Sequence, residues 1–245
     1  MVVDMNHVKW LSKTCIQREA DLLISAWSGF LGQEIEPPIP VEEIAEKYLQ
    51  LRVEFDDLEQ IIGIPDVLGA TWVEERRMMI NERLLEGAEG RIIFTCSHEI
   101  GHWILHRSYL EDKVLRQGNL PSVVCRQSSQ KTRGEWQADH FAACLLLPQA
   151  AVFAGYRRAF GEEPLTIYNE RSCFKRRNGI ALDPSLDTLK EIAEKVMDSG
   201  KFTNVSREAM VYRLQELGLI INRTCQPIYS YFDSSLSQGE KSVNI

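Results

Sequence analysis

The sequence predicts an α+β fold: a mainly helical core with a small antiparallel sheet, followed by a C-terminal helix-turn-helix-like region. Three observations support this class. Apolar residues recur at helical spacing in several long segments, and short alternating segments typical of strands lie between residues 51 and 81. Two capped helical segments then lie close together near the C-terminus, at 185–198 and 207–217.

The N-terminal third predicts two helices followed by strands. Residues 9–31 carry apolar side chains at helical spacing and predict an amphipathic helix. The prolines of "EPPIP" cannot continue that helix, and residues 41–50 predict a second, short one. Residues 51–58 alternate as a strand does, and 69–84 predict two short strands around a charged turn.

Two central helices are expected to carry the chemistry of the chain. The first spans about 91–107 and the second 134–147, where Pro148 ends it. The polar segment 108–133 between them contains Gly118 and Pro121 and predicts a long exposed loop.

The composition favours a protein of the reducing cytoplasm. The 245 residues are 44% hydrophobic and 26% charged, which is ordinary for a globular protein, and the net charge of −7 argues against a general attraction to nucleic acid. No apolar run approaches the length of a membrane span, and the N-terminus lacks the pattern of a secretory signal. The 6 cysteines are scattered without a CxxC pair.

The segment "HEIGH" predicts a metal site on the first central helix. His98 and His102 stand four residues apart, so they lie on one helical face and can present two imidazole nitrogens to one ion. Glu99 is rotated to the side, where it can reach a metal-bound water. Zinc lowers the pKa of such a water to about 7, and a glutamate can remove its proton as the water attacks a carbonyl. The alternative is a buried helix whose histidines are satisfied by core hydrogen bonds.

His106 extends the same stripe but is not expected to bind the ion. At the standard rise it lies about 12 Å along the helix axis from His98. We expect His106 to be a residue of the helix C-terminus that the helix dipole favours.

The second central helix offers the third ligand that a catalytic zinc site needs. Glu135 and Asp139 share one helical face in "RGEWQADHFAACLLLP". Glu135 can complete a His₂Glu set, and Asp139 can accept the outer N–H of a ligand histidine. Asp139 or His140 as the ligand remains an alternative, as does a solvated Glu135 that only favours the helix dipole.

The two central segments, "FTCSHEIGHWILHR" and "EWQADHFAACLLLP", together resemble the ImmA/IrrE family of zinc metallopeptidases. The weaker flanking resemblance extends over most of 17–222. It implies a cytoplasmic zinc endopeptidase that cleaves a helix-turn-helix repressor and derepresses mobile-element or stress-response genes. It also implies His98, His102 and Glu135 as zinc ligands, Glu99 as general base and Asp139 as a residue behind the ligands. Gln137 departs from the family, where many members carry a second acidic residue.

The expected organisation has four parts. Residues 1–36 form an N-terminal helix and linker, and 37–155 form the metallopeptidase core. A helical, helix-turn-helix-like region follows at 156–233, and 234–245 form a disordered tail.

Two rival functions remain open on the sequence. The helices within 185–222 could read DNA, although acidic residues oppose their few basic ones, so the chain would be a DNA- or repressor-binding regulator. A structural metal site in a noncatalytic protein is the other rival, although it would not need Glu99 beside the first ligand. Manganese or another divalent ion could also compete with zinc.

The position of the substrate is the least defined expectation. Peptidases of this kind commonly hold their substrate as an added strand, and residues 77–81 are one candidate edge, with an internal strand as the equal alternative. Tyr156, Arg157 and His140 are candidates for steadying the oxyanion.

Overall fold

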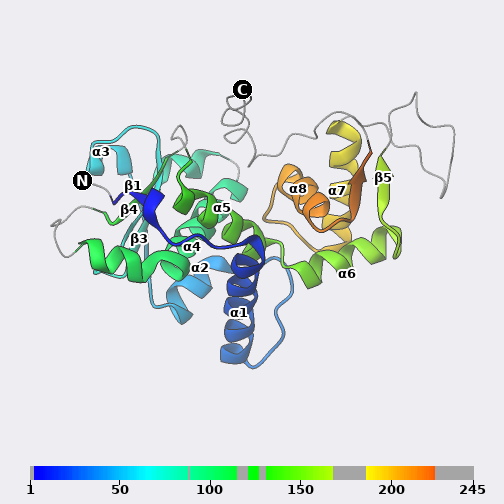
Figure 1. Ribbon diagram of the computed structural model, residues 1–245, viewed down its shortest axis with the longest axis horizontal. Helices are drawn as coiled ribbons and strands as arrows, with labels where there is room; N and C mark the ends of the chain where they lie inside the picture. Colours follow the sequence, from blue (N-terminus) through cyan, green and yellow to red (C-terminus); the bar gives the residue numbers. More distant parts are fainter. Residues whose placement is uncertain (1–2, 88, 115–120, 127–130, 168–185, 224–245) are drawn as a thin grey trace, which may run out of the picture. The chain divides into compact units, whose positions relative to one another are not determined.

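The computed structural model describes residues 3–87, 89–114, 121–126, 131–167 and 186–223, which are shown as coloured ribbon in Figure 1. The chain divides into two compact units, Met1–Pro148 and Gln149–Ile245. The sequence placed this division after residue 155 and set 1–36 apart. The tail expected at 234–245 lies outside the described residues.

The first unit contains most of the helices and a four-stranded sheet. Its helical elements are η1 (Met5–His7), α1 (Lys13–Leu31), α2 (Val41–Glu43), η2 (Ile44–Tyr48), α3 (Leu58–Ile62), η3 (Glu82–Glu86), α4 (Glu89–Val114) and α5 (Arg133–Leu146). Its strands are β1 (Arg52–Asp56), β2 (Val67–Trp72), β3 (Arg77–Asn81) and β4 (Val123–Arg126). The α+β class is therefore confirmed.

Side-chain caps fix where the principal helices begin. The Ser12 hydroxyl accepts from the Cys15 N–H at the start of α1, and Gly32 ends that helix in the left-handed conformation. The Thr132 hydroxyl accepts from the N–H of Glu135 at the start of α5. This second cap places Glu135 in the first turn of its helix.

The sheet is mixed, whereas the sequence predicted an antiparallel sheet. Its strand order is β1-β3-β2-β4; β1 runs parallel to β3, whereas β2 is antiparallel to both β3 and β4. The candidate substrate edge at 77–81 is wrong, because β3 lies between two partners. Its residues 78–81 are all buried, as an internal strand requires. Among the described strands of this sheet, β1 and β4 form the edges.

The sheet separates α3 from α4. The residues Leu58, Val67, Ala70, Trp72 and Met79 form an apolar cluster on the α3 side. Gly69 and Thr71 of β2 instead face α4, where both come close to Glu99. Because successive side chains of β2 point to opposite faces, one face packs in the apolar cluster and the other lies beside Glu99.

The long loop expected over 108–133 is only partly correct. Helix α4 continues to Val114, because Leu110 is fully buried one turn beyond His106 while the polar side chains are solvated. The Arg107–Glu111 ion pair of 2.7 Å lies on that exposed side. Strand β4 then occupies part of the remaining segment.

The N-terminal segment 3–9 is part of the first unit. The Tyr109 hydroxyl donates to the Asp4 carbonyl at 3.0 Å, and Arg133 donates to the Val8 carbonyl at 3.1 Å. Met5 packs against Gly134, where an added Cβ would meet the Met5 side chain at 2.7 Å. These residues therefore cover the start of α5.

The second unit consists of helices α6 (Gln149–Phe160), α7 (Leu186–Gly200) and α8 (Arg207–Glu216), with strands β5 (Leu165–Ile167) and β6 (Ile220–Asn222). The helices expected at 185–198 and 207–217 are confirmed, although residue 185 itself is outside the described part. Strands β5 and β6 pair in parallel and were not expected. Backbone approaches closely where Gly155 faces Gly200, which explains the small residues there.

No single described helix is long and apolar enough to cross a bilayer. The consecutive helices α5 and α6 would meet the length and composition criteria only as a broken pair, as core helices of globular proteins also do.

Candidate metal centre

Helix α4 brings His98 and His102 onto one buried face. The two side chains stand one turn apart, and their Nε2 atoms are 3.0 Å apart. Both imidazoles are almost completely shielded from solvent. At this distance one ring can donate to the other, or both can bind one ion.

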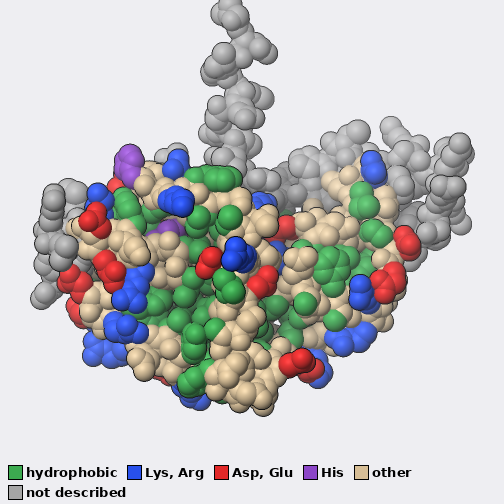
Figure 2. Space-filling model, turned by 60° about the horizontal axis from the view of Figure 1, so that its bottom comes forward, with side chains coloured by type: hydrophobic (Ala, Val, Ile, Leu, Met, Phe, Trp, Pro, Cys, Tyr) green, Lys and Arg blue, Asp and Glu red, His purple; other side chains and the backbone are tan. Residues whose placement is uncertain are grey.

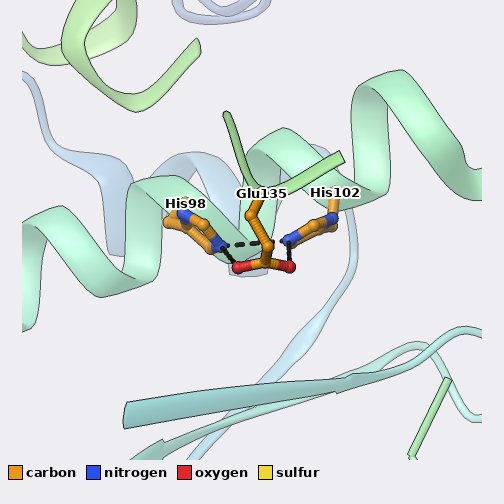
Figure 3. A group of neighbouring side chains, drawn as sticks. All are labelled: His98, His102 and Glu135. Carbon is orange, nitrogen blue, oxygen red and sulfur yellow. Dashed lines mark hydrogen bonds and ion pairs between the residues drawn. The ribbon is translucent and has the colours of Figure 1, made fainter. Parts of the chain in front are cut away.

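Glu135 of α5 supplies the third group. Its Oε1 lies 3.1 Å from His102 Nε2, and its Oε2 lies 3.3 Å from His98 Nε2. Figure 3 shows the carboxylate between the two imidazole rings, which come from one helix. The ligand atoms of these three residues all lie within 4.8 Å of one another.

This arrangement fits a divalent cation of the zinc type. Tetrahedral coordination with bonds of about 2.05 Å separates neighbouring ligand atoms by about 3.3 Å. The two imidazole nitrogens are 3.0 Å apart, close to that value, and each lies near a different Glu135 oxygen, at 3.1 and 3.3 Å. Three protein ligands from two helices also leave a position for a fourth, non-protein ligand.

Asp139 lies behind His98, in the place that the sequence indicated. Its Oδ1 accepts from His98 Nδ1 at 2.9 Å, so the opposite nitrogen of the ring is directed at Glu135. Lys131 donates to the other oxygen of Asp139 at 2.6 Å. Asp139 is therefore not part of the converging set, and neither is His140, whose ring stacks on Trp136 at 5.7 Å.

Glu99 lies beside the triad and not in it. Its Oε2 accepts from the Thr71 hydroxyl at 2.6 Å, so β2 holds the carboxylate. Its Oε1 is buried and has no hydrogen-bond partner within the described part of the chain. One Glu99 oxygen lies within 4.8 Å of a His98 nitrogen and of the Cys125 sulfur. An unpaired buried oxygen at this place is suited to a water next to the ion.

Gly69 provides the space that Glu99 occupies. A Cβ at position 69 would lie 2.7 Å from Glu99 Oε1 and 2.9 Å from Thr95 Cγ2. Neither Gly69 nor Thr71 carries a motif in the sequence, so both were missed. A glycine in a buried strand is the only signal that pointed to this close approach.

The protein shifts the pKa values of Glu99 and Glu135, the two glutamates of this site, in opposite directions. Burial is the largest influence on Glu99 and raises its pKa, although His102, His98 and the Thr71 hydroxyl act against it. Burial would also raise the pKa of Glu135, but the charge and hydrogen bond of His102, together with His98, outweigh it and lower the pKa. The lowered pKa of Glu135 favours the anion that a cation would bind, and the raised pKa of Glu99 makes it the better proton acceptor.

His106 is not at a helix C-terminus as expected, because α4 continues for two further turns. Its Nδ1 lies 3.1 Å from His102 Nδ1, and its Nε2 lies 2.8 Å from Gln137 Oε1. Burial, followed by the charge of His102, lowers the pKa of His106 to about 3. His106 therefore contacts a ligand histidine from behind, a role that the spacing alone did not reveal.

The structure does not support the candidates for oxyanion stabilisation. The Tyr156 hydroxyl is hydrogen-bonded within the second unit, to the Glu163 carbonyl and the Leu165 N–H, both at 2.9 Å. Arg157 pairs with Glu162 at 2.9 Å, and His140 is stacked on Trp136.

Comparison with family models finds a match over the residues of this site. Residues 47–159 match the Peptidase_M78 family model, described as the IrrE N-terminal-like domain. No curated protein matches the chain significantly. The matched range contains His98, Glu99, His102, Glu135 and Asp139. Residues 47–159 therefore carry an IrrE N-terminal-like domain, which bears out the resemblance of the two central segments.

Proposed function

We propose that the protein is a zinc-dependent endopeptidase whose ion is held by His98, His102 and Glu135. The observation that carries this proposal is the pairing of a converging His₂Glu triad with a separately held carboxylate, Glu99. A structural metal site could close its fourth position with Cys125, whose sulfur lies within 4.8 Å of a His98 nitrogen. Such a site would, however, have no use for a buried glutamate with one unpaired oxygen.

The chemistry that zinc supplies when bound is Lewis-acid activation of water and of a peptide carbonyl. Glu99 takes the proton of the attacking water through its unpaired Oε1 and later delivers that proton to the leaving amine. Thr71 holds the other oxygen, so the carboxylate does not turn away between the two transfers. Asp139 holds His98 in the tautomer that directs Nε2 at the ion.

The substrate that we propose is a helix-turn-helix transcriptional repressor in the cytoplasm, whose cleavage derepresses mobile-element or stress-response genes. The support for this step is the resemblance of the two central segments to the ImmA/IrrE peptidases. The match of residues 47–159 to the IrrE N-terminal-like domain agrees with that resemblance.

Direct DNA reading by α7 and α8 is the weaker candidate. Lys190 pairs with Glu208 at 2.7 Å, and Arg207 approaches Glu194 to 3.6 Å. Arg213 is buried and pairs with Glu216 at 2.7 Å. Figure 2 also shows Lys and Arg side chains mixed with Asp and Glu over the face that it draws. Phosphate binding needs clustered basic groups that are not already paired.

The deciding experiment separates metal binding from cleavage. Wild type and Glu99→Gln are purified, their zinc content is measured, and each is incubated with the helix-turn-helix repressor encoded nearest to the gene. We expect about one zinc in each protein, and cleavage that falls by about a hundredfold or more in the variant. Glu111→Gln, an exposed change on the same helix, is the matched control and should cut normally.

The other outcomes are equally informative. If both proteins bind zinc and cleave the repressor at the same rate, Glu99 is not the base. If neither binds zinc, the three converging side chains are a hydrogen-bonded core and the proposal fails. Salt-sensitive DNA binding by the wild type without cleavage would favour the regulator instead.

A further inference from the structure

A chain of hydrogen bonds runs from the N-terminal segment to one of the proposed ligands. Gln137 Nε2 donates to the main-chain carbonyl of Lys9 at 3.0 Å, and Gln137 Oε1 lies 2.8 Å from His106 Nε2. His106 Nδ1 in turn lies 3.1 Å from His102 Nδ1. His102, His106 and Gln137 are all nearly or fully buried, so water does not compete for these contacts.

The Lys9 carbonyl fixes which atoms in this series of hydrogen bonds donate and which accept. A carbonyl can only accept, so the amide of Gln137 must turn its NH₂ group toward Lys9 and its oxygen toward His106. The reversed amide would oppose two acceptor oxygens at Lys9. The proton of His106 therefore lies on Nε2, which leaves Nδ1 as an acceptor.

The same logic then fixes His102. An acceptor at His106 Nδ1 requires the proton of His102 to lie on its own Nδ1. The Nε2 atom of His102 keeps its lone pair, and this is the atom that lies 3.1 Å from Glu135 and 3.0 Å from His98 Nε2. The opposite tautomer would point an N–H at the position of the ion.

We propose that His106 and Gln137 are positioning residues that set the tautomer of His102, with the Lys9 carbonyl as their anchor. The inference rests on the proposed function for the presence of the ion, because without a cation the Glu135 carboxylate, 3.1 Å from His102 Nε2, would itself favour a proton on that atom. The two ligand histidines are then held by different means. Asp139 holds His98 with a charge, whereas a neutral imidazole and a neutral amide hold His102.

The first test reads the ring protons directly, in the wild-type protein loaded with zinc. Long-range ¹H–¹⁵N correlation spectra distinguish the two neutral imidazole tautomers, and single histidine substitutions assign the rings. We expect His102 with its proton on Nδ1 and His106 with its proton on Nε2. A proton on Nδ1 of His106 in these spectra would overturn the proposal, whatever the protein cleaves.

The second test breaks the chain at Gln137. In Gln137→Met, His106 Nε2 loses its hydrogen-bond acceptor, so we expect mixed tautomers of His106 and His102. Zinc affinity, measured by competition with a chelating dye, should fall by about ten- to a hundredfold. Gln137→Glu loses the donor to Lys9 but keeps an acceptor for His106 Nε2, so it should retain the wild-type tautomers, a rescue that a purely space-filling role would not show.

A matched control comes from the same helix. His140→Phe changes a buried histidine that is not part of the series of hydrogen bonds from Lys9 to His102. It keeps the stacking on Trp136, so zinc affinity should stay at the wild-type value. Unchanged tautomers and affinity in Gln137→Met would overturn the inference while leaving the proposed function intact. The predicted tautomers in a wild type that binds zinc but cleaves no repressor would support the inference and count against the proposed function alone.

Discussion

Gly69→Ala should place a methyl group where the Glu99 carboxylate now lies. The added Cβ would be 2.7 Å from Glu99 Oε1 and 2.9 Å from Thr95 Cγ2. Ordinary contacts are about 3.3 Å for carbon to oxygen and at least about 3.5 Å for carbon to carbon. Both neighbours must therefore retreat by about 0.6 Å, and Glu99 cannot do so easily because Thr71 holds its other oxygen.

The expected cost has two parts. Crowding a well-packed interior by one methyl group costs about 1–3 kcal/mol of unfolding free energy. Displacing a catalytic group by about 1 Å can lower the rate by about a hundredfold, so a displacement of roughly 0.6 Å should lower kcat/KM by about ten- to a hundredfold. The zinc content should remain that of the wild type, because none of the three proposed ligands is among the nearest atoms to the new Cβ.

The assay combines thermal unfolding, zinc content and cleavage of the repressor. Gly29→Ala is the matched control, since nothing lies within 4 Å of its added Cβ and it stands in the exposed part of α1. It should leave cleavage unchanged and stabilise the helix by up to about 1 kcal/mol. Wild-type stability and cleavage in Gly69→Ala would show that Glu99 has room to move, and would refute the account of how its carboxylate is held.

Two further predictions concern the pH profile and the ion. Thr71→Val removes a hydrogen bond that lowers the pKa of Glu99, so this pKa should rise further; because the base must be ionised, the acidic limb of the kcat/KM profile should move to higher pH, whereas Thr71→Ser should leave it in place. An unmoved limb in Thr71→Val would show that Glu99 is not the titrating base. Zinc at a hundred times its Kd should stabilise the wild type by about 2.7 kcal/mol relative to protein treated with a chelator, as measured by thermal unfolding. Glu135→Gln should lose most of this gain, and an equal gain in that variant would exclude Glu135 as a ligand.

The triad could be predicted from sequence because helical geometry is local. Two residues four apart on one helix must share a face, so "HEIGH" indicated His98 and His102 before any tertiary contact was known. The same spacing gave Glu135 and Asp139. What spacing could not give is the group behind each of these residues. Thr71 meets Glu99 across 28 positions, and Lys9 meets Gln137 across 128.

The errors have physical causes of the same kind. Strand alternation indicated β1, β2 and β3, but it does not specify which strand pairs with which, so it left β3 open as either an edge or an internal strand. The end of α4 was set too early because its solvated face turns strongly polar after His106. The buried side of the helix continues to Leu110, and one buried residue per turn is a weak signal among charged neighbours.

The N-terminal segment has a consequence for the order in which the first unit can fold. Lys9 and Gln137 are separated by 128 positions, and the contacts of Asp4 and Val8 span 105 and 125. During synthesis the segment therefore waits without its partners until α5 has left the ribosome. His98 and His102 emerge well before Glu135, so the nascent chain presents an incomplete ion site for much of its synthesis. A fragment cut to the matched residues 47–159 would keep the ligands but lack Lys9, and Gln137 would have lost its anchor.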